Sequence, residues 1–169
     1  MKNLLKVALV AACIVFAGNI AKAQKIGYVA LDQVVDQMPE TKAAIANITA
    51  YNKQFIDQLT TMNNELQSKS QAYQAQRATM TDAVRGAKES ELNDLNKRLQ
   101  DYSNDAKQKV DAKRDELGKP IIDKARAAVA QVAKEKGYTY VVNSSQTDLI
   151  VSPPGDDMMA EVKAKLGLK

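Results

Sequence analysis

The sequence predicts a mainly α-helical fold with a small β part, in which a long antiparallel coiled-coil hairpin is joined to a small α+β association body. Apolar residues recur every three and four positions from residue 40 to residue 84, which is the spacing of helices that supercoil on one another. Short strand-like runs lie near both ends of the helical region. Aromatic residues are scarce, so the composition favours extended helices over a compact globular core.

Residues 1–23 have the features of a secretory signal peptide. Lysines flank the start of an apolar stretch over residues 4–17, and a small-residue triplet ends at Ala23. The apolar stretch is shorter than the roughly 20 residues that span a bilayer, so we expect export with cleavage after Ala23. A lipoprotein is the alternative, because residues 10–13 have the form of a lipobox that ends at Cys13.

Removal of the leader leaves a nearly neutral chain. The whole chain has a net charge of +4, and the leader holds three lysines and no acidic residue, which leaves +1. This balance argues against a nucleic-acid partner and allows at most weak contact with a membrane surface. Nine basic side chains against five acidic ones over residues 107–136 are interpreted as a solvated helix face.

The residue types give no sign of catalysis. The chain has no histidine, and its one cysteine lies in the leader, which excludes histidine general bases and soft-ligand metal sites from the mature chain. The acidic pairs Asp32 with Asp36 and Asp156 with Asp157 have no neighbouring base, nucleophile or substrate pocket in the predicted elements. We therefore predict no catalytic residue, no cofactor and no metal site, and a protein that is not an enzyme.

The segment before the hairpin, residues 24–39, is assigned to the body. Residues 25–30 predict a strand, since they are partly β-branched and aromatic. Asp32 is a suitable N-cap for a short helix that runs to Met38, and Pro39 separates that helix from the next.

The first helix of the arm is predicted from Glu40 to Val84. Neither proline nor glycine interrupts this range. The positions expected to face the second helix alternate in steps of three and four: Ile45, Ile48, Asn52, Phe55, Leu59, Met62, Leu66, Lys69, Tyr73, Gln76, Met80 and Ala83.

The hairpin tip is predicted near residues 85–90. Gly86 would end the first helix in the left-handed conformation, and Ser90 would cap the second. The arm then spans residues 40–119, and each of its helices is on the order of 60 Å long. The positions expected to face back are Leu92, Leu95, Leu99, Tyr102, Ala106, Lys109, Lys113 and Leu117.

The chain returns to the body over residues 120–169. Pro120 predicts a kink in the return helix rather than its end, and the helix continues over residues 120–136 to Gly137. The spacing then changes from that of a helix to that of strands. The elements predicted from here are strands at 138–143 and 148–151 and a last helix at 157–166.

The short strands predict self-association. Three such strands cannot make a stable sheet alone, and exposed sheet edges are completed most simply by other copies of the chain. The candidate residues of this association body are Ile26, Tyr28, Val29, Tyr138, Tyr140, Val142, Leu149 and Val151.

The order of these segments resembles the Skp/OmpH family of periplasmic chaperones over essentially the whole mature chain. The resemblance is carried by residues 25–29, the break at Pro39, the glutamine-rich heptad hairpin, the helix from Lys119 to Gly137, and residues 138–143 and 148–151. It implies a jellyfish-shaped homotrimer whose three hairpins enclose a cavity. It also implies that unfolded outer-membrane proteins are held in this cavity in the periplasm, without ATP. The near-neutral charge departs from the strongly basic best-known members.

Several seam residues are candidates for contact with other proteins as well as for packing between the helices. Methionine is adaptable and tyrosine is amphipathic, so both suit contact with many different sequences. The candidate residues of the arm are Met62, Leu66, Tyr73, Met80, Leu92, Leu95, Leu99 and Tyr102.

Polar residues interrupt the predicted seam. The interval from Lys109 to Lys113 has no apolar seam position in this assignment, and a hairpin with few buried contacts opens at low free energy. The hypothesis is a compliant arm, and the alternative is that the polar residues fix the register of the helices.

The leading functional hypothesis is an ATP-independent holdase chaperone that prevents aggregation through many weak contacts. The alternative is a structural coiled-coil spacer or adaptor of the cell envelope. A module that binds lipid headgroups would need a concentrated basic patch, which the charge balance does not favour.

Overall fold

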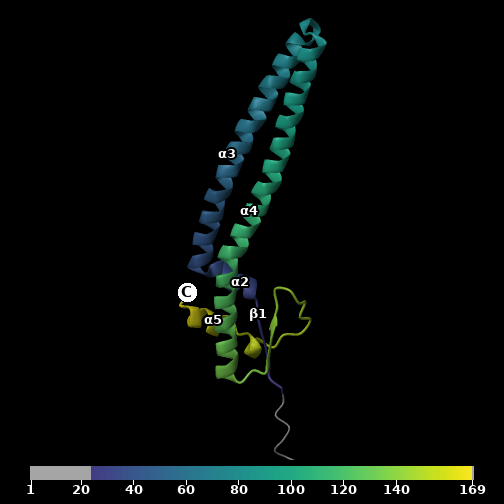
Figure 1. Ribbon diagram of the computed structural model, residues 1–169. Helices are drawn as coiled ribbons and strands as arrows, with labels where there is room; N and C mark the ends of the chain where they lie inside the picture. Colours follow the sequence, from purple (N-terminus) through teal and green to yellow (C-terminus); the bar gives the residue numbers. More distant parts are fainter. Residues whose placement is uncertain (1–23, 169) are drawn as a thin grey trace, which may run out of the picture. The chain divides into compact units, whose positions relative to one another are not determined.

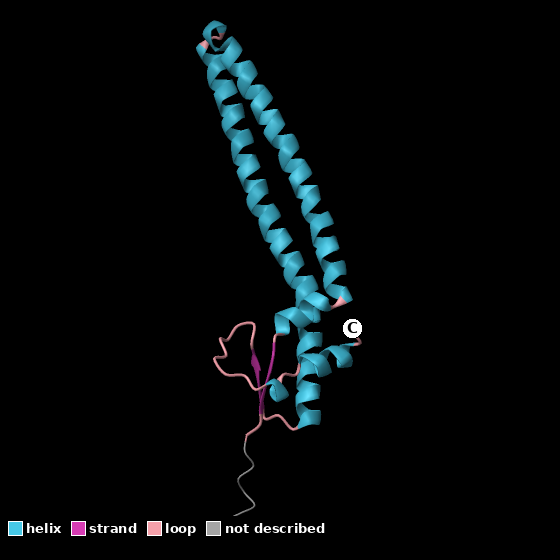
Figure 2. Ribbon diagram, turned by 180° about the vertical axis from the view of Figure 1, so that it is seen from behind, coloured by secondary structure: helices cyan, strands magenta, loops and turns pink. Residues whose placement is uncertain are grey.

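The computed structural model describes residues 24–168, so the predicted signal peptide and Cys13 lie outside the described residues. The described chain is mainly helical with a small two-stranded sheet, which confirms the predicted fold class at this level (Figure 2). The elements in chain order are β1 (Ile26–Val29), α2 (Leu31–Gln37), α3 (Pro39–Gln76), the 3-10 turn η1 (Arg77–Thr79), α4 (Asp82–Lys136), β2 (Tyr140–Asn143), the 3-10 turn η2 (Pro154–Asp156) and α5 (Met159–Leu166).

The chain divides into two compact units. Residues 24–34 and 126–168 form the first, called the body below, and residues 35–125 form the second, called the arm. Helix α4 runs through the boundary, so its first part belongs to the arm and its last part to the body.

The arm consists of α3 and the first part of α4, which lie side by side and run in opposite directions (Figure 1). Pro39 occupies the first turn of α3, where its missing N–H breaks no helical hydrogen bond. Neither glycine nor a further proline occurs in its 38 residues, which give a helix of about 57 Å.

The hairpin tip lies at residues 77–81, so its prediction near 85–90 was wrong. The turn η1 follows α3, and Met80 is extended with φ −78° and ψ 144°. The hydroxyl of Thr81 accepts a hydrogen bond of 3.4 Å from the N–H of Val84, which caps the new helix.

Gly86 and Ser90, the predicted cap residues, both lie inside α4. Gly86 has no positive φ, and a side chain added there would meet no atom within 4 Å. The prediction gave the first available glycine more weight than the hydroxyl of Thr81, although a side-chain cap can begin a helix without any glycine before it.

The return helix continues past Pro120, as predicted. Helix α4 is assigned without a break from Asp82 to Lys136, and Pro120 lies in its interior. The helix ends at Gly137, whose φ of 74° is the left-handed conformation expected of a C-terminal cap.

The sheet of the body consists of two parallel strands, one before and one after the two long helices. Strand β1 pairs with β2 in the register Ile26 to Tyr140 and Val29 to Asn143. The N–H of Thr139 donates to the carbonyl of Lys25 at 2.7 Å, which extends the pairing by one position. Parallel pairing needs a long crossover, and here the crossover contains the whole arm.

No strand forms at residues 148–151, so this prediction is corrected. In the described chain the only bridge outside β1 and β2 joins Tyr28 to Asp157. Ile150 and Val151 are 94% and 82% exposed. Their β-branched side chains suit a strand, but a strand exists only where a neighbouring backbone pairs with it, and the single chain presents none here.

Helix α5 is fixed by its first residues. The N–H of Met158 donates to the carbonyl of Tyr28 at 2.9 Å, and the carboxylate of Asp157 accepts from the N–H of Met159 at 2.9 Å. The N-cap residue itself is Met158, so Asp157 accepts this hydrogen bond from the position before the cap. The side chains that fill the core of the body are Val29, Val34, Val132, Met158 and Val162, all 2% exposed or less.

Candidate functional site

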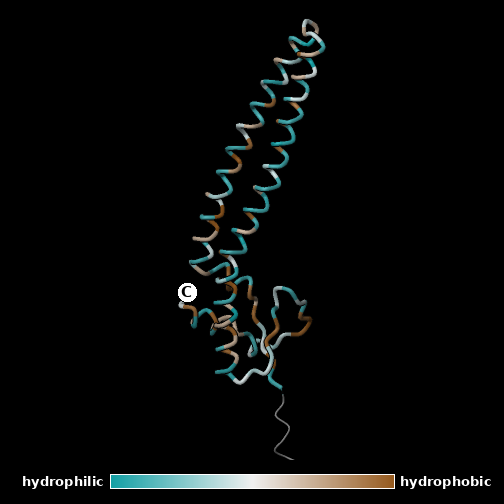
Figure 3. Tube along the Cα trace, in the orientation of Figure 1, coloured by the Kyte–Doolittle hydropathy of each residue, from teal (hydrophilic) through white to brown (hydrophobic). Residues whose placement is uncertain are grey.

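The seam between α3 and α4 is the first surface on which the sequence placed functional residues. Tyr73 of α3 is 7% exposed and Leu95 of α4 is 2% exposed. The rings of Phe55 and Tyr102 meet across the two helices, with their centroids 6.1 Å apart. Hydrophobic positions recur along both helices between hydrophilic stretches (Figure 3).

Along α3 the structure follows the predicted seam from Ile48 to Tyr73. The seam positions between these two are half-buried, including Met62 and Leu66. Ile45 was wrongly included, because it is 59% exposed and its neighbour Ala44 is buried instead. Gln76 and Ala83 are exposed, since the chain leaves the helix pair near the tip.

Along α4 the seam changes its spacing after Ala106. Leu92, Leu99 and Tyr102 are half-buried. The next buried position is Val110, four residues after Ala106, whereas the predicted Lys109 is exposed. The predicted apolar gap from Lys109 to Lys113 is therefore filled by Val110, which removes the observation on which the hypothesis of a compliant arm was built.

Charged and polar side chains join the two helices near the tip. Lys69 of α3 forms an ion pair with Glu91 of α4, and the hydroxyl of Tyr73 donates to the carboxylate of Glu89. Lys88 lies 2.9 Å from Glu91 on the same helix. Met80 and Leu92 line a small cavity beside these groups.

The ion pairs shift the pKa values of their partners. Hydrogen bonds from Lys69 and Lys88 lower the pKa of Glu91 to about 2. The pKa of Lys69 is raised, chiefly by its hydrogen bond to Glu91. Donation to Glu89 raises the pKa of Tyr73. The ion pair of Lys69 with Glu91 therefore stays charged at neutral pH, and it joins the two helices near the hairpin tip, next to the buried Tyr73 and Leu95.

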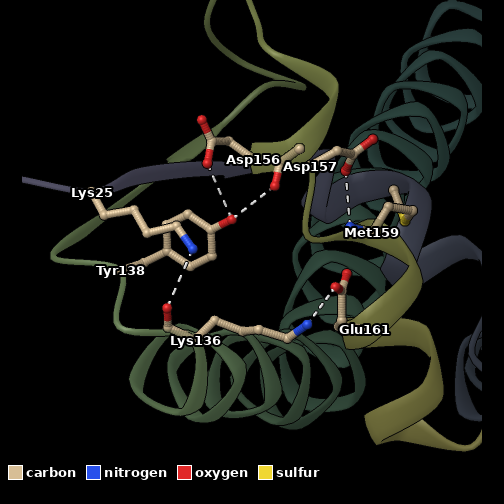
Figure 4. A network of polar contacts seen from close by, with 8 residues as sticks. Lys25, Lys136, Tyr138, Asp156, Asp157, Met159 and Glu161 are labelled. Atoms are coloured by element: carbon tan, nitrogen blue, oxygen red, sulfur yellow. Dashed lines mark hydrogen bonds and ion pairs between the residues drawn. The ribbon is translucent and has the colours of Figure 1, made fainter.

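In the body, a polar network ties the last helix to the N-terminal residues (Figure 4). The hydroxyl of Tyr138 donates to the carbonyl of Gly155 at 3.2 Å. The ammonium of Lys25 lies 4.0 Å from the centroid of the Tyr138 ring, where a cation is attracted by the ring face. Lys136 pairs with Glu161 at 2.8 Å, which lowers the pKa of Glu161.

An open apolar surface lies on the body beside β1. A groove of about 670 Å³ runs along this strand toward the loop that precedes η2. Ile26 and Tyr140 are 51% and 57% exposed, and the loop adds Ile150 and Val151. Exposed apolar side chains gathered at a sheet edge are typical of an interaction surface. The residues that line the groove include Ile26, Tyr28, Val142, Leu149 and Val151.

The candidate body residues therefore divide into three groups by exposure. Val29 is core, at 2% exposure. Tyr28, Tyr138, Val142 and Leu149 are half-buried. The remaining candidates, Ile26, Tyr140 and Val151, are exposed.

Sequence reasoning missed the buried Val34, Val132, Met158 and Val162 as a common cluster. The apolar spacing of the return helix and of the last helix was visible, but the sequence did not show that these two faces meet.

Two kinds of feature are absent from the described chain. None of its helices has an apolar stretch long enough to cross a membrane. No group of three or more acidic, histidine or cysteine side chains within residues 24–168 comes together in a way that could hold a metal ion.

Comparison with known proteins identifies the family. Residues 25–166 match the OmpH-like outer membrane protein family. A chaperone protein Skp from Photorhabdus luminescens is 26% identical over 166 residues, covering 96% of this chain and 97% of that protein. A second chaperone protein Skp, from Photorhabdus laumondii, is 26% identical over 156 residues, covering 90% of this chain and 92% of its own length.

A solved structure shares the fold. The crystal structure of a putative outer membrane chaperone (OmpH-like) from Caulobacter crescentus superposes with a TM-score of 0.69 at 15% identity, covering 85% of this chain and 83% of that one. The family match spans both units described above. The chain therefore belongs to the OmpH-like outer membrane protein family, whose relatives named here are chaperones.

Proposed function

We propose that this protein is an ATP-independent holdase chaperone of the periplasm that binds unfolded outer-membrane proteins between the arms of a homotrimer and prevents their aggregation. Membership in a family with chaperone relatives supports the chaperone role. The signal peptide expected at residues 1–23 and the names of the relatives support the compartment and the class of client.

The observation that carries the assembly is the open apolar surface of the body. Ile150 and Val151 are almost fully exposed beside a two-stranded sheet. On the strands themselves, Ile26 and Tyr140 are apolar or aromatic side chains that are also exposed. A single chain leaves this surface exposed to water, whereas further copies of the chain would cover it.

An assembly through the body would bring several arms to one client. Each arm offers only weak contacts, but simultaneous engagement multiplies them without any new kind of contact. Because the mature chain has a charge near zero, we expect apolar contacts and hydrogen bonds to hold clients more than net attraction does.

The first test is the molar mass of the protein in solution by light scattering. Three chains are expected, and Val151→Asp should reduce the mass because it places a charge on the covered surface. The matched control is Thr147→Asp, at an exposed position of the same loop that does not line the groove. A mass of two chains, unchanged by Val151→Asp, would contradict the assembly and favour the coiled-coil spacer.

The second test measures chaperone activity. A urea-denatured outer-membrane β-barrel protein is diluted into buffer with and without this protein, and light scattering follows aggregation. Suppression at severalfold molar excess, without ATP, is expected. No suppression by an intact trimer would refute the proposed function.

A further inference from the structure

One flank of α3 carries no charged residue from Ile56 to Gln74, and before Ile56 it is interrupted only by Lys53, which pairs with Asp57. Its uncharged members follow one another in steps of three, four and seven, so they lie on one side of the helix. We call this flank the neutral stripe. Its residues are Ile45, Thr49, Ile56, Thr60, Asn63, Gln67, Ser70 and Gln74.

The neutral stripe is open to solvent. Ile45 and Ile56 are 59% and 51% exposed, which is unusual for isoleucine. Farther along the helix, a shallow groove of about 510 Å³ lies on the same flank. The side chains that line the groove are uncharged: Thr60, Asn63, Asn64, Leu66, Gln67, Ser70 and Gln71.

Helix α4 has a different surface. Charged residues make up 24 of its 55 positions, compared with six of 38 in α3. Many of them pair along the helix, such as Lys97 with Asp101 at 2.6 Å and Asp105 with Lys109 at 2.8 Å. Such pairs are typical of a helix face that remains in water. The neutral stripe is therefore a feature of α3, and α4 has no comparable surface.

The side chains of the neutral stripe match the groups of an unpaired polypeptide. Asparagine and glutamine amides both donate and accept hydrogen bonds, as do peptide groups whose partners in a sheet are missing. Ile45 and Ile56 can cover apolar side chains of the same segment. A surface without charge does not reject acidic or basic segments, so it can accept many sequences.

A second copy of the arm fits this surface less well. The two exposed isoleucines lie about 16 Å apart along the helix, and Thr49 and the charged Lys53 stand between them. A stable interface between two copies buries about 1,200–2,000 Å² around an apolar centre. The neutral stripe has no continuous apolar centre and instead suits weak contacts at several points.

We propose that the neutral stripe is the surface of the arm that holds unfolded polypeptide, through amide hydrogen bonds to the main chain and through isoleucine contacts to apolar side chains. This inference rests on the proposed chaperone function and assigns it to one flank of one helix. It differs from the seam residues, whose role is to pack α3 on α4.

Two pairs of matched variants test the assignment. Ile56→Ser removes an exposed apolar side chain from the stripe, and Val84→Ser removes one that is 47% exposed near the tip. Gln67→Glu adds a charge to the stripe, and Gln100→Glu adds the same charge to exposed α4. The probe is the urea-denatured barrel protein, and the readout is the chaperone concentration that halves its aggregation.

The double variant Ile56→Ser with Gln67→Glu should need about three- to tenfold more chaperone, as the loss of a few weak contacts predicts. Val84→Ser with Gln100→Glu should stay within about twofold of the wild type. Circular dichroism and molar mass check that both double variants fold and assemble. If the wild type suppresses aggregation and both double variants need the same chaperone concentration, the neutral stripe is not the binding surface. The proposed chaperone function would be unaffected by that result.

Photocrosslinking gives a second readout that needs no loss of activity. A photoreactive phenylalanine at Gln67 should form adducts with the barrel protein, and the same group at Gln100 should form few. Adducts between two copies of this chain at Gln67, in the presence of client, would show that a second copy occupies the stripe and would overturn the proposal. A wild type that suppresses no aggregation would instead refute the chaperone function itself.

Discussion

The body and the arm bury their side chains in different ways. In the body, side chains from β1, α2, α4 and α5 converge on one cluster, in which Val34 and Val162 have no exposed surface and Met158 has 1%. In the arm, the long stretch from residue 45 to residue 105 contains only two buried side chains, Tyr73 and Leu95, and most other seam residues there are half-buried. The remaining buried side chains of the arm lie outside this stretch: Met38, Ala44, Ala106, Val110, Ile121 and Ala125.

The two units are therefore expected to unfold in different ways. A compact cluster is lost as a whole, so the body should unfold cooperatively. The helix pair of the arm is held by contacts spread along its length, and each stretch can open at a lower free energy than the whole. Four sets of substitutions test this contrast, and their expected effects decrease in the order given below.

The largest effect is expected from Met158→Ala in the body. Met158 is 1% exposed, and removal of a buried methionine side chain costs about 2–5 kcal/mol through lost burial and the cavity that remains. Urea denaturation of the intact protein measures it. Met159→Ala is the control, since Met159 is half-buried and should lose clearly less. Equal losses would show that the cluster is not the centre of the body.

The second effect is expected from Leu95→Ala in the arm. Leu95 is 2% exposed, so its truncation should cost about 2 kcal/mol or more, but locally. Amide hydrogen exchange should rise around Leu95 in α4 and around Leu66 in the facing part of α3, and it should stay unchanged in β1 and β2. A uniform rise through both units would contradict the contrast. Leu99→Ala, at a half-buried position, should give a smaller change.

Gly86→Ala should stabilise the arm. Gly86 lies in the interior of α4 with open space around it, and alanine is favoured over glycine there by about 0.5–1 kcal/mol. Exchange near the tip should slow. Gly137→Ala is the control of opposite sign, because its φ of 74° strains any side chain. A destabilised Gly86→Ala would place the hairpin turn back at this glycine.

The smallest effect is expected from the ion pairs at the tip, since exposed pairs are screened by water and salt. The pKa of Glu91 is about 2 when folded, below its usual 4.5, so its contribution is complete above pH 4.5 and is lost as pH falls toward 2. Exchange at the tip should therefore rise over this range. Glu91→Gln should raise amide hydrogen exchange at the tip at pH 7 and should remove most of its change with pH below 4.5. If exchange in the variant changed with pH as in the wild type, the role given to Glu91 would be contradicted.

The sequence predicted the register of the first arm helix well. Steps of three and four from Ile48 to Tyr73 follow the heptad spacing, and the structure places these residues toward α4. The same rule failed after Ala106, where two steps of four bring Val110 and not Lys109 to the seam. A strict heptad assignment cannot see such a change, because only the partner helix decides which face is covered.

The body was less predictable because its elements are distant in sequence. The strands at 25–30 and 138–143 were evident from their residues, but their parallel pairing and the burial of Met158 depend on contacts across the whole chain. The exposed candidates, such as Tyr140 and Val151, look like core residues in sequence, since the same side chains suit a buried strand and a surface between proteins.

The pairing of the two chain ends imposes an order on folding. Lys25 bonds to Lys136 across 111 residues and Leu31 to Asn143 across 112, whereas the contacts at the hairpin tip join residues about twenty positions apart. Closing a short loop costs less conformational entropy than closing a long one. The helix pair of the arm can therefore form from its tip before β1 pairs with β2. A newly made chain can therefore finish the helices of its arm before β1 pairs with β2. Under the proposed assembly through the body, copies would then associate only after the C-terminal residues have been synthesised.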